Sequence, residues 1–355
     1  MRIFIIMLVV IMLFTSCVQN TIPTNIENNN IPTSIPTTTI PSEPSEPTEP
    51  TIPENSPTEP IEPEIPEENT PEQPLKELES DVPIKLKQLL LQMEKNGRNL
   101  LLYGNLEKND KIVELEQLLN SYESNISLAV YSLDGLKGLI YNGNQKYFSA
   151  CTIKIPWMLY LCKRIDDGMY SKDDIITYEE RHYHKGSGKI RYSDFGTQYT
   201  VEDLIHLCLS ISDNVAYKML LEYIDRTDYY TYIDKLSCPS LHIPEKSIWS
   251  NNARVRDFLV IWQESYHYFA TDTDGAKILK KACTNTPFNY GTKTLKGEDY
   301  SHKSGDNFGT YCAYNDAGIV WADNAYVYAI FTKSEGTEYD VQFVNQVMTI
   351  IHKLF

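Results

Sequence analysis

The chain has 355 residues, of which 42% are hydrophobic, with 32 basic and 48 acidic side chains and a net charge of −16. This length and hydrophobic content are sufficient for a large folded domain. The acidic balance, with no basic run and no basic patch interleaved with aromatic residues, argues against a nucleic-acid-binding protein.

Residues 1–17 have the pattern of an export signal. Arg2 supplies a positive charge, and Ile3 to Phe14 form an apolar run that is short for a membrane span. The small residues before Cys17 resemble a lipobox, so we expect a lipoprotein signal peptide and lipidation of Cys17. The exported protein would then be anchored to the outer face of the cell membrane without spanning it. A plain secretory signal with an incidental cysteine is the alternative.

Residues 18–82 have the composition of a disordered linker. They hold 14 of the 19 prolines and 14 acidic residues against one lysine, Lys76, and they contain no aromatic residue. Such a segment cannot bury enough apolar surface to offset its ordering entropy, and proline and like charges keep it extended. We interpret it as an acidic stalk that precedes a folded catalytic domain at 83–355. Outside the stalk and Arg2 the chain has 30 basic and 34 acidic side chains, so that domain is close to neutral.

The folded domain shows helical and strand patterns in an informative order. Apolar residues spaced by three and four predict helices at 85–95, 111–123, 204–209 behind a cap at Thr200, 215–224, 256–268 and 341–354. Short runs rich in β-branched and aromatic residues predict strands at 126–132, 139–141, 315–321 and 325–331. Strands at both ends with helices between them predict an α+β fold, with an antiparallel sheet flanked by helices beside an all-helical lobe.

Cys151 and Lys154 form a candidate nucleophile and base. They lie three residues apart, and the apolar run Ile155–Leu161 follows them. If a helix begins near Cys151, both side chains share one face, and the free N–H groups of its first turn favour a thiolate and an oxyanion. An activated nucleophile needs this arrangement. Taken alone, the pair has an alternative interpretation as a buried core cysteine beside a solvated lysine.

Two later motifs favour the catalytic interpretation. Ser212-Asp213-Asn214 follows the first motif by about sixty residues, and Lys303-Ser304-Gly305 follows after about ninety more. Each alone is a common cap or turn. In this order and spacing they match the S-x-x-K, S-D-N and K-[ST]-G motifs. The chain from about Asn125 to its end therefore resembles class A β-lactamases and related penicillin-binding serine hydrolases, with Cys151 in place of the family's serine.

The resemblance implies a role for each matched residue. The implied catalytic residues are Cys151, Lys154 and Ser212. The implied substrate-binding residues are Asn214, Lys303, Ser304, Gly305 and Asp306. The nucleophile attacks a carbonyl carbon, Lys154 takes or stabilises its proton, and Ser212 relays a proton to the leaving nitrogen. Lys303 polarises Ser212 and attracts a substrate carboxylate. The Lys303 motif is expected just before a strand, so that the backbone N–H of Asp306 lies opposite that of Cys151 in an oxyanion hole.

One element of the resemblance is missing. Class A β-lactamases carry an Ω-loop glutamate, followed soon by an asparagine, that activates the hydrolytic water. The matching region here is roughly 241–257, where the usual Glu-x-x-Leu-Asn pattern is absent. Glu245 is the nearest acid, and we interpret it as a surface charge. An acyl-enzyme lacking this base would be hydrolysed slowly.

Two functional hypotheses follow. The first is an acyl-transfer hydrolase that acts on β-lactams or related cell-wall peptide amides through an acyl-enzyme on Cys151, with no cofactor and no metal. The second is a surface lipoprotein of the penicillin-binding kind that binds such ligands without turnover. In both, the partners are a small-molecule β-lactam or a peptidoglycan peptide, together with the membrane through the lipid anchor, and we expect a monomer.

The remaining cysteines and the histidines carry weaker signals. Cys162 and Cys208 lie in apolar helical surroundings and are expected to be buried thiols. A Cys238–Cys283 disulfide is compatible with an exported protein. His182 and His184 have the spacing of a metal-binding pair, but nothing else in the sequence supports a zinc site.

Overall fold

The computed structural model describes residues 86–88, 90–91, 99–122, 125–287, 290–291, 295 and 297–355. The predicted signal with Cys17 and the predicted linker lie outside the described residues. Within the predicted helix 85–95, the described residues 86–88 and 90–91 are helical. In the described part of the chain, no helix combines the length and the apolar character needed to cross a membrane.

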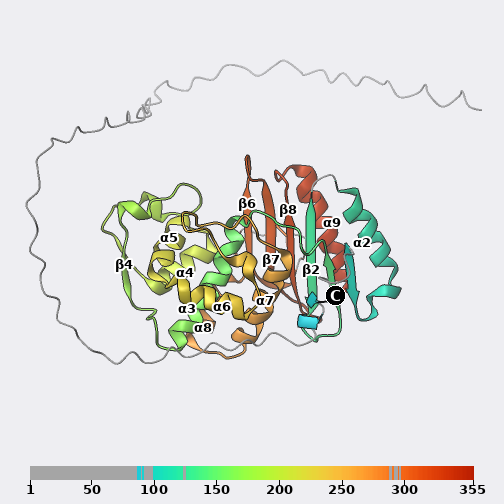
Figure 1. Ribbon diagram of the computed structural model, residues 1–355, viewed down its shortest axis with the longest axis horizontal. Helices are drawn as coiled ribbons and strands as arrows, with labels where there is room; N and C mark the ends of the chain where they lie inside the picture. Colours follow the sequence, from blue (N-terminus) through green and yellow to red (C-terminus); the bar gives the residue numbers. More distant parts are fainter. Residues whose placement is uncertain are drawn as a thin grey trace, which may run out of the picture. The chain divides into compact units, whose positions relative to one another are not determined.

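A six-stranded antiparallel sheet forms the centre of the domain (Figure 1). Its strands in spatial order are β1 (Leu100–Tyr103), β3 (Gly138–Tyr141), β2 (Ile126–Ser132), β8 (Tyr326–Thr332), β7 (Ala313–Trp321) and β6 (Asp299–Asn307). The register pairs Leu128 with Ile330 on β2 and β8, and Gly305 with Asn315 on β6 and β7. Because β6 is an edge strand, one row of its backbone groups is not used by the sheet.

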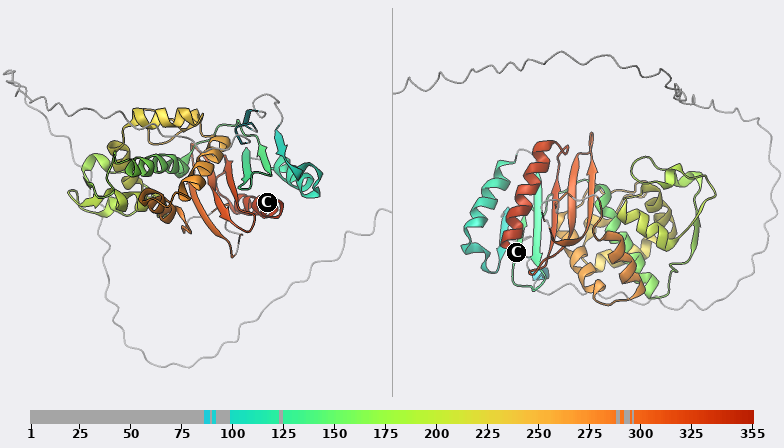
Figure 2. Two further views of the ribbon diagram at one scale, coloured as in Figure 1. Left: turned by 90° about the horizontal axis from the view of Figure 1, so that it is seen from below. Right: turned by 180° about the vertical axis from the view of Figure 1, so that it is seen from behind.

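Both faces of the sheet are buried. Along β2, Leu128 and Val130 join one apolar core, whereas Ala129 and Tyr131 join the other, as the two-residue period of a strand requires. The first core is covered by α2 (Asp110–Ser121) and α9 (Glu338–Leu354), which lie together on one face (Figure 2). The second core extends through α7 (Val255–Phe269) into the helical lobe.

The helical lobe lies on the far side of α7 from the sheet (Figures 1 and 2). Its helices are α3 (Lys154–Asp166), α4 (Val201–Ser210), α5 (Asn214–Tyr223), α6 (Arg226–Lys235) and α8 (Asp274–Cys283). α3 is buried along most of its length because helices and sheet surround it, and its Trp157 ring stacks on Tyr229 of α6 with centroids 3.6 Å apart. The buried Lys163 of α3 donates a hydrogen bond to Glu264 of α7, so this internal pair is neutralised.

The structure confirms the predicted α+β class and the long periodic elements. The predicted helix 111–123 is α2, 256–268 is α7 and 341–354 is α9, each within a few residues of its predicted ends. Strand 126–132 matches β2 at both ends. The sequence analysis did not predict β1, α6, α8 or the strand β6. It also missed a two-stranded ribbon of β4 (Ile175–Thr177) and β5 (Gln198–Thr200), so the helical lobe is not purely helical.

Candidate active site

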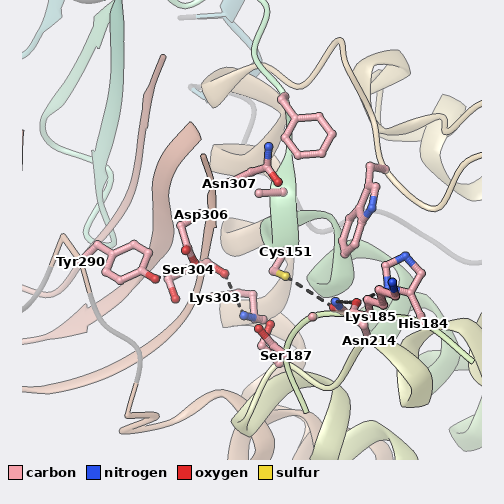
Figure 3. Close-up of a pocket in the computed structure, with 15 residues that line it drawn as sticks. Cys151, His184, Lys185, Ser187, Asn214, Tyr290, Lys303, Ser304, Asp306 and Asn307 are labelled. Carbon is pink, nitrogen blue, oxygen red and sulfur yellow. Dashed lines mark hydrogen bonds between the residues drawn. The ribbon is translucent and has the colours of Figure 1, made fainter. Parts of the chain in front are cut away.

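The predicted residues converge on one cavity of about 370 Å³ (Figure 3). The three motif segments, which are far apart in the chain, all contribute to it: the turn that carries Cys151, the Ser212–Asn214 segment and the edge strand β6. The predicted residues that line it are Cys151, Ser212, Asn214, Lys303, Ser304 and Asp306. The other two, Lys154 and Gly305, lie directly behind these residues, as their contacts below show.

Cys151 lies in a 3-10 turn, Ala150–Ile153, and the α-helix α3 begins only at Lys154. A helix therefore does begin near Cys151, but its first turn is a 3-10 turn and the regular α-helix follows it. Ala150, just before the nucleophile, has φ 44°, in the left-handed region that costs a non-glycine residue on the order of 1 kcal/mol. This turn leaves the backbone N–H of Cys151 without a hydrogen-bond partner among the described residues.

The Lys154 side chain connects the first motif to the second. It is fully buried, and its Nζ donates to the Ser212 carbonyl (2.7 Å), to Ser212 Oγ (3.2 Å) and to Asn214 Oδ1 (2.7 Å). Three acceptors match the three N–H groups of an ammonium. The Cys151 thiol lies 3.9 Å from the same Asn214 oxygen.

The environment of Cys151 favours the thiolate. Burial would raise the pKa of the thiol, but the positive charges of Lys154 and Lys303 and hydrogen bonding with Ser212 and Lys154 together hold it below its ordinary value. Burial lowers the pKa of Lys303 to about 8, with the Cys151 thiolate opposing the shift and Lys154 adding to it. The site therefore holds a low-pKa thiol between two buried cations.

Asp213, the middle residue of the second motif, is structural. Its buried carboxylate caps α5 by accepting from Val215 N (2.9 Å) and Ala216 N (3.0 Å). The other oxygen accepts from Lys189 N (2.6 Å) and Ile190 N (2.9 Å), which fixes the loop that forms one wall of the cavity. Ser212 beside it has φ 58°, a second left-handed residue at the site.

The loop that Asp213 holds needs glycine at Gly188. That residue has φ 109°, and a Cβ there would lie 2.2 Å from the Asp213 carboxyl carbon. The resulting close approach brings Lys185 and Ser187 to the cavity wall. The Lys185–Gly188 run is thus a turn packed on the second motif.

The third motif lies within β6 and not before a strand, which corrects the sequence-based placement. A Cβ on Gly305 would lie 2.5 Å from Cys151 N and 2.8 Å from Thr152 N, so only glycine allows the strand to approach the nucleophile turn this closely. Lys303 is buried, and its Nζ donates to the Ser304 carbonyl at 2.8 Å. On β7, Asn315 donates to the Phe148 carbonyl at 2.9 Å and ties the chain before Cys151 to the sheet.

The backbone N–H of Asp306 points to the open edge of the sheet. On the same strand, Tyr300 directs its N–H and its carbonyl away from β7, towards Asn285. Such directions repeat at every second residue of an antiparallel ladder, and the register continues without a break through Asp306. The N–H of Asp306 therefore points away from β7, on the edge strand that lines the cavity. It is a candidate oxyanion donor, together with the N–H of Cys151.

Residues 245–250, after α6, contribute Trp249 to the wall of the cavity beside Lys154 and are called the covering segment. Two hydrogen bonds connect it to the nucleophile turn. Ser149 N donates to the Ser250 carbonyl at 2.8 Å, and the hydroxyl Oγ of Ser149 accepts from Ser250 N at 3.1 Å. This pairing places the Trp249 ring 5.7 Å from Lys154 Nζ. Glu245, in the same segment, is exposed and does not line the cavity.

The sequence analysis missed several described cavity residues. They are Phe148, His184, Trp249, Tyr290 and Asn307. None belongs to a motif, and only their nearness in the chain to a motif or to the Ω-loop region could have indicated them. His184 lies beside Trp249, with ring centroids 6.1 Å apart, and burial lowers its pKa.

The Cys238–Cys283 disulfide that the sequence left open is not formed, because both cysteines are free and buried. The Cys238 thiol donates to the carbonyls of Leu236 and Asp257, and the Cys283 thiol donates to the carbonyl of Lys280. Each thiol therefore has its own backbone acceptor. The predicted burial of Cys162 and Cys208 is confirmed. His182 accepts from Glu179 N and pairs with Glu222, away from His184.

Comparison with known proteins agrees with this geometry. The model of the "Beta-lactamase enzyme family" matches residues 111–355. Beta-lactamase VEB-1 of Pseudomonas aeruginosa is 23% identical over 251 residues, which cover 63% of this chain and 82% of that protein.

Solved structures share the fold. PBP-A has a TM-score of 0.63 at 20% identity, over 70% of this chain and 96% of that one. A beta-lactamase from Sphaerobacter thermophilus has a TM-score of 0.58 at 20% identity, over 69% and 96%. Since the family model matches well over half of the residues and its region contains all three motifs, this chain belongs to the beta-lactamase enzyme family of hydrolases.

Proposed function

We propose that this protein reacts with β-lactams or related cell-wall peptide amides to form a covalent acyl-enzyme on Cys151, which is then released slowly. The observation that carries the proposal is the convergence of a thiol whose pKa is lowered and two buried lysines at one cavity. It is supported by the similarity to a protein named a beta-lactamase. It is also supported by a structural neighbour solved as an acyl-enzyme complex with penicillin G.

The acylation step follows from the contacts. The Cys151 thiolate attacks the carbonyl carbon, and the new oxyanion lies between the N–H groups of Cys151 and Asp306. The C–N bond then breaks, and the leaving nitrogen takes a proton delivered through Ser212 from Lys154, which contacts that hydroxyl. Lys303 attracts a carboxylate of the substrate. Lys154 and Lys303 together stabilise the thiolate before attack.

Slow release follows from the covering segment. Hydrolysis of the thioester needs a water with a general base beside it. Trp249 occupies the cavity wall near Lys154, and Glu245 is exposed. Asp306 is the one carboxylate among the described lining residues, and it belongs to the β6 wall. A hydrolytic water next to the acyl group therefore lacks a dedicated base on the Trp249 side.

Intact-mass measurement after exposure to benzylpenicillin tests the proposal. We expect an adduct that persists and that maps to Cys151. Cys312 is the matched control, because it is the other partly exposed thiol among the described cysteines. Cys312→Ser should keep the adduct and Cys151→Ala should lose it. Rapid release of hydrolysed penicillin would instead identify an efficient β-lactamase, and the absence of any adduct would favour binding without turnover.

We also propose that the domain acts at the outer face of the cell membrane, tethered by a lipid on Cys17 and the stalk 18–82. The pattern of Arg2, the apolar run and the small residues before Cys17 supports this location. The same location fits both hypotheses, because peptidoglycan peptides and β-lactams are met outside the membrane.

A further inference from the structure

The cavity has an acidic end that the proposed acylation does not use. The side chain of Asp306 lines the cavity and is exposed. In the proposed acylation only its backbone N–H has a role, as an oxyanion donor. Figure 3 shows Asp306 and Tyr290 on one side of Cys151, with Lys185 and His184 on the other. The cations Lys154 and Lys303 lie at the base, so the charge of the cavity is divided between a basic part and one carboxylate.

The Asp306 carboxylate is held in place. It accepts a hydrogen bond from the Tyr290 hydroxyl at 2.7 Å. The Tyr290 ring stacks on Tyr314 of β7 with centroids 4.3 Å apart, and its backbone N–H donates to Asp316 at 3.0 Å. Asp316 is fully buried and also bonds His302 at 2.9 Å. Tyr290 is therefore fixed by a buried network, and it fixes Asp306.

A carboxylate at this position has an energetic consequence for acylation. Negative charge develops on the substrate oxygen beside the Asp306 N–H, and a neighbouring carboxylate opposes that charge. It also repels a substrate carboxylate that lies on the β6 side. A substrate cation that pairs with Asp306 removes both penalties. The paired carboxylate no longer opposes the developing oxyanion and no longer repels the substrate carboxylate.

We propose that Asp306 is a specificity-determining residue that selects acyl donors carrying a positively charged group, such as an ammonium, next to the reacting amide. Such a donor presents its carboxylate to Lys303 and its cation to Asp306, which makes the preferred substrates zwitterionic. Tyr290 is a positioning residue that acts through Asp306. This inference rests on the proposed acylation of Cys151.

Matched β-lactam pairs test the selection. Cephaloridine and cephalothin have the same acyl side chain, but the first carries a pyridinium where the second carries an acetoxy group. Ampicillin and carbenicillin differ in having an ammonium or a carboxylate on the same carbon. We expect the second-order acylation rate of the full-length protein to favour the cationic member of at least one pair. In Asp306→Asn that preference should fall by at least about fivefold, the effect of two unit charges about 4 Å apart in bulk water, where the interaction is weakest.

Three controls separate charge selection from other effects. Asp306→Glu keeps the charge and should keep the preference. Asp299→Asn removes one exposed charge from the other end of β6 and should leave the preference unchanged. In the unmodified protein, the preference should shrink as salt is raised, which tests the proposal even if a variant fails to fold.

The outcomes are distinguishable from failure of the proposed function. If Cys151 is acylated but the preference is the same in Asp306→Asn and insensitive to salt for both pairs, the selection by Asp306 is wrong and the acylation stands. If no probe acylates Cys151, the proposed function itself fails.

Discussion

At the scale of single residues, the chemistry depends on sulfur at a position where the family resemblance expects a hydroxyl. Sulfur is larger than oxygen and its bonds are longer, so the attacking atom is displaced towards the oxyanion donors, and catalysis is sensitive to displacements of this size. In compensation, a thiolate forms more readily than an alkoxide, and the two lysines favour it further. Acylation is thus compatible with Cys151, and the slow release proposed above is the consequence expected when no water-activating base is present.

The first prediction concerns the nucleophile and its base. Cys151→Ala should abolish acylation by benzylpenicillin, while Cys151→Ser should keep or raise it because the cavity has the family's arrangement around that side chain. Lys154→Ala should slow acylation by at least about 100-fold, the usual scale for losing a general acid or base, because it removes both the thiolate's neighbouring charge and the proton donor. Acylation kinetics of the three variants decide the matter. Undiminished acylation in Cys151→Ala would show that another residue is the nucleophile.

The second prediction concerns pH. The pKa of Lys303 is lowered to about 8, so its positive charge is present below that pH and is lost above it. Acylation by a carboxylate-bearing β-lactam should therefore fall as pH rises through about 8. Lys303→Arg should remove this decline, because arginine stays protonated.

A neutral alkylating reagent provides the control for the pH profile. Iodoacetamide has no carboxylate, so its reaction with Cys151 should rise with thiolate formation and show no decline near pH 8. The inflection should lie below the value of about 8.5 for a free thiol, because the pKa of Cys151 is lowered. An inflection at or above that value would contradict an activated nucleophile.

At the scale of elements, the site depends on how closely β6 lies against the nucleophile turn. The contact is between backbones, at Gly305 on the strand and Cys151 and Thr152 in the turn. Hydrogen bonds from Asn315 and Ser250 hold the chain before Cys151 from two other directions. The turn is therefore clamped between the sheet and the covering segment, which keeps Ala150 in its strained conformation.

The third prediction tests this contact. Gly305→Ala places a Cβ 2.5 Å from Cys151 N, so the strand or the turn must shift. We expect acylation to fall by about 100-fold, the cost of a misplacement of about 1 Å, with a loss of about 1–3 kcal/mol in stability. Gly196→Ala is the control, because its Cβ meets nothing within 4 Å although its φ of 94° strains alanine. That variant should melt at a lower temperature but keep its acylation rate. Equal acylation in both variants would show that the close approach at Gly305 does not matter.

At the scale of the whole molecule, the proposed arrangement has three parts in chain order: a lipid on Cys17, the acidic stalk and a nearly neutral folded domain. Proline and like charges extend such a stalk, so a domain anchored in this way can reach targets away from the bilayer.

The fourth prediction concerns that anchor. Cys17→Ala should release the protein from the membrane fraction, because the lipid would have no attachment site. Cys312→Ala, a change to a thiol within the folded domain, should leave fractionation unchanged. If Cys17→Ala still sediments with membranes, the lipobox interpretation is wrong.

Sequence by itself determined the family, the long periodic elements and the residues of the three motifs. Elements such as β2 and α7 have strong local periodicity, and local periodicity is readable in a chain without knowledge of its contacts. The three motifs were readable because their chemistry needs particular side chains in a set order. Cys151, Lys154, Ser212 and Lys303 therefore meet as predicted.

Only the tertiary structure decided how these residues are held and what surrounds them. The Lys303 motif lies inside β6, although its residues, Lys-Ser-Gly-Asp, have little strand propensity, because pairing with β7 overrides that preference. The positions of Trp249, Tyr290 and the Asp306 side chain depend on backbone pairing and stacking between distant segments. The free state of Cys238 and Cys283 likewise depends on where the fold places each thiol, the first after α6 and the second at the end of α8. These features arise from contacts between residues far apart in the chain, which no local pattern records.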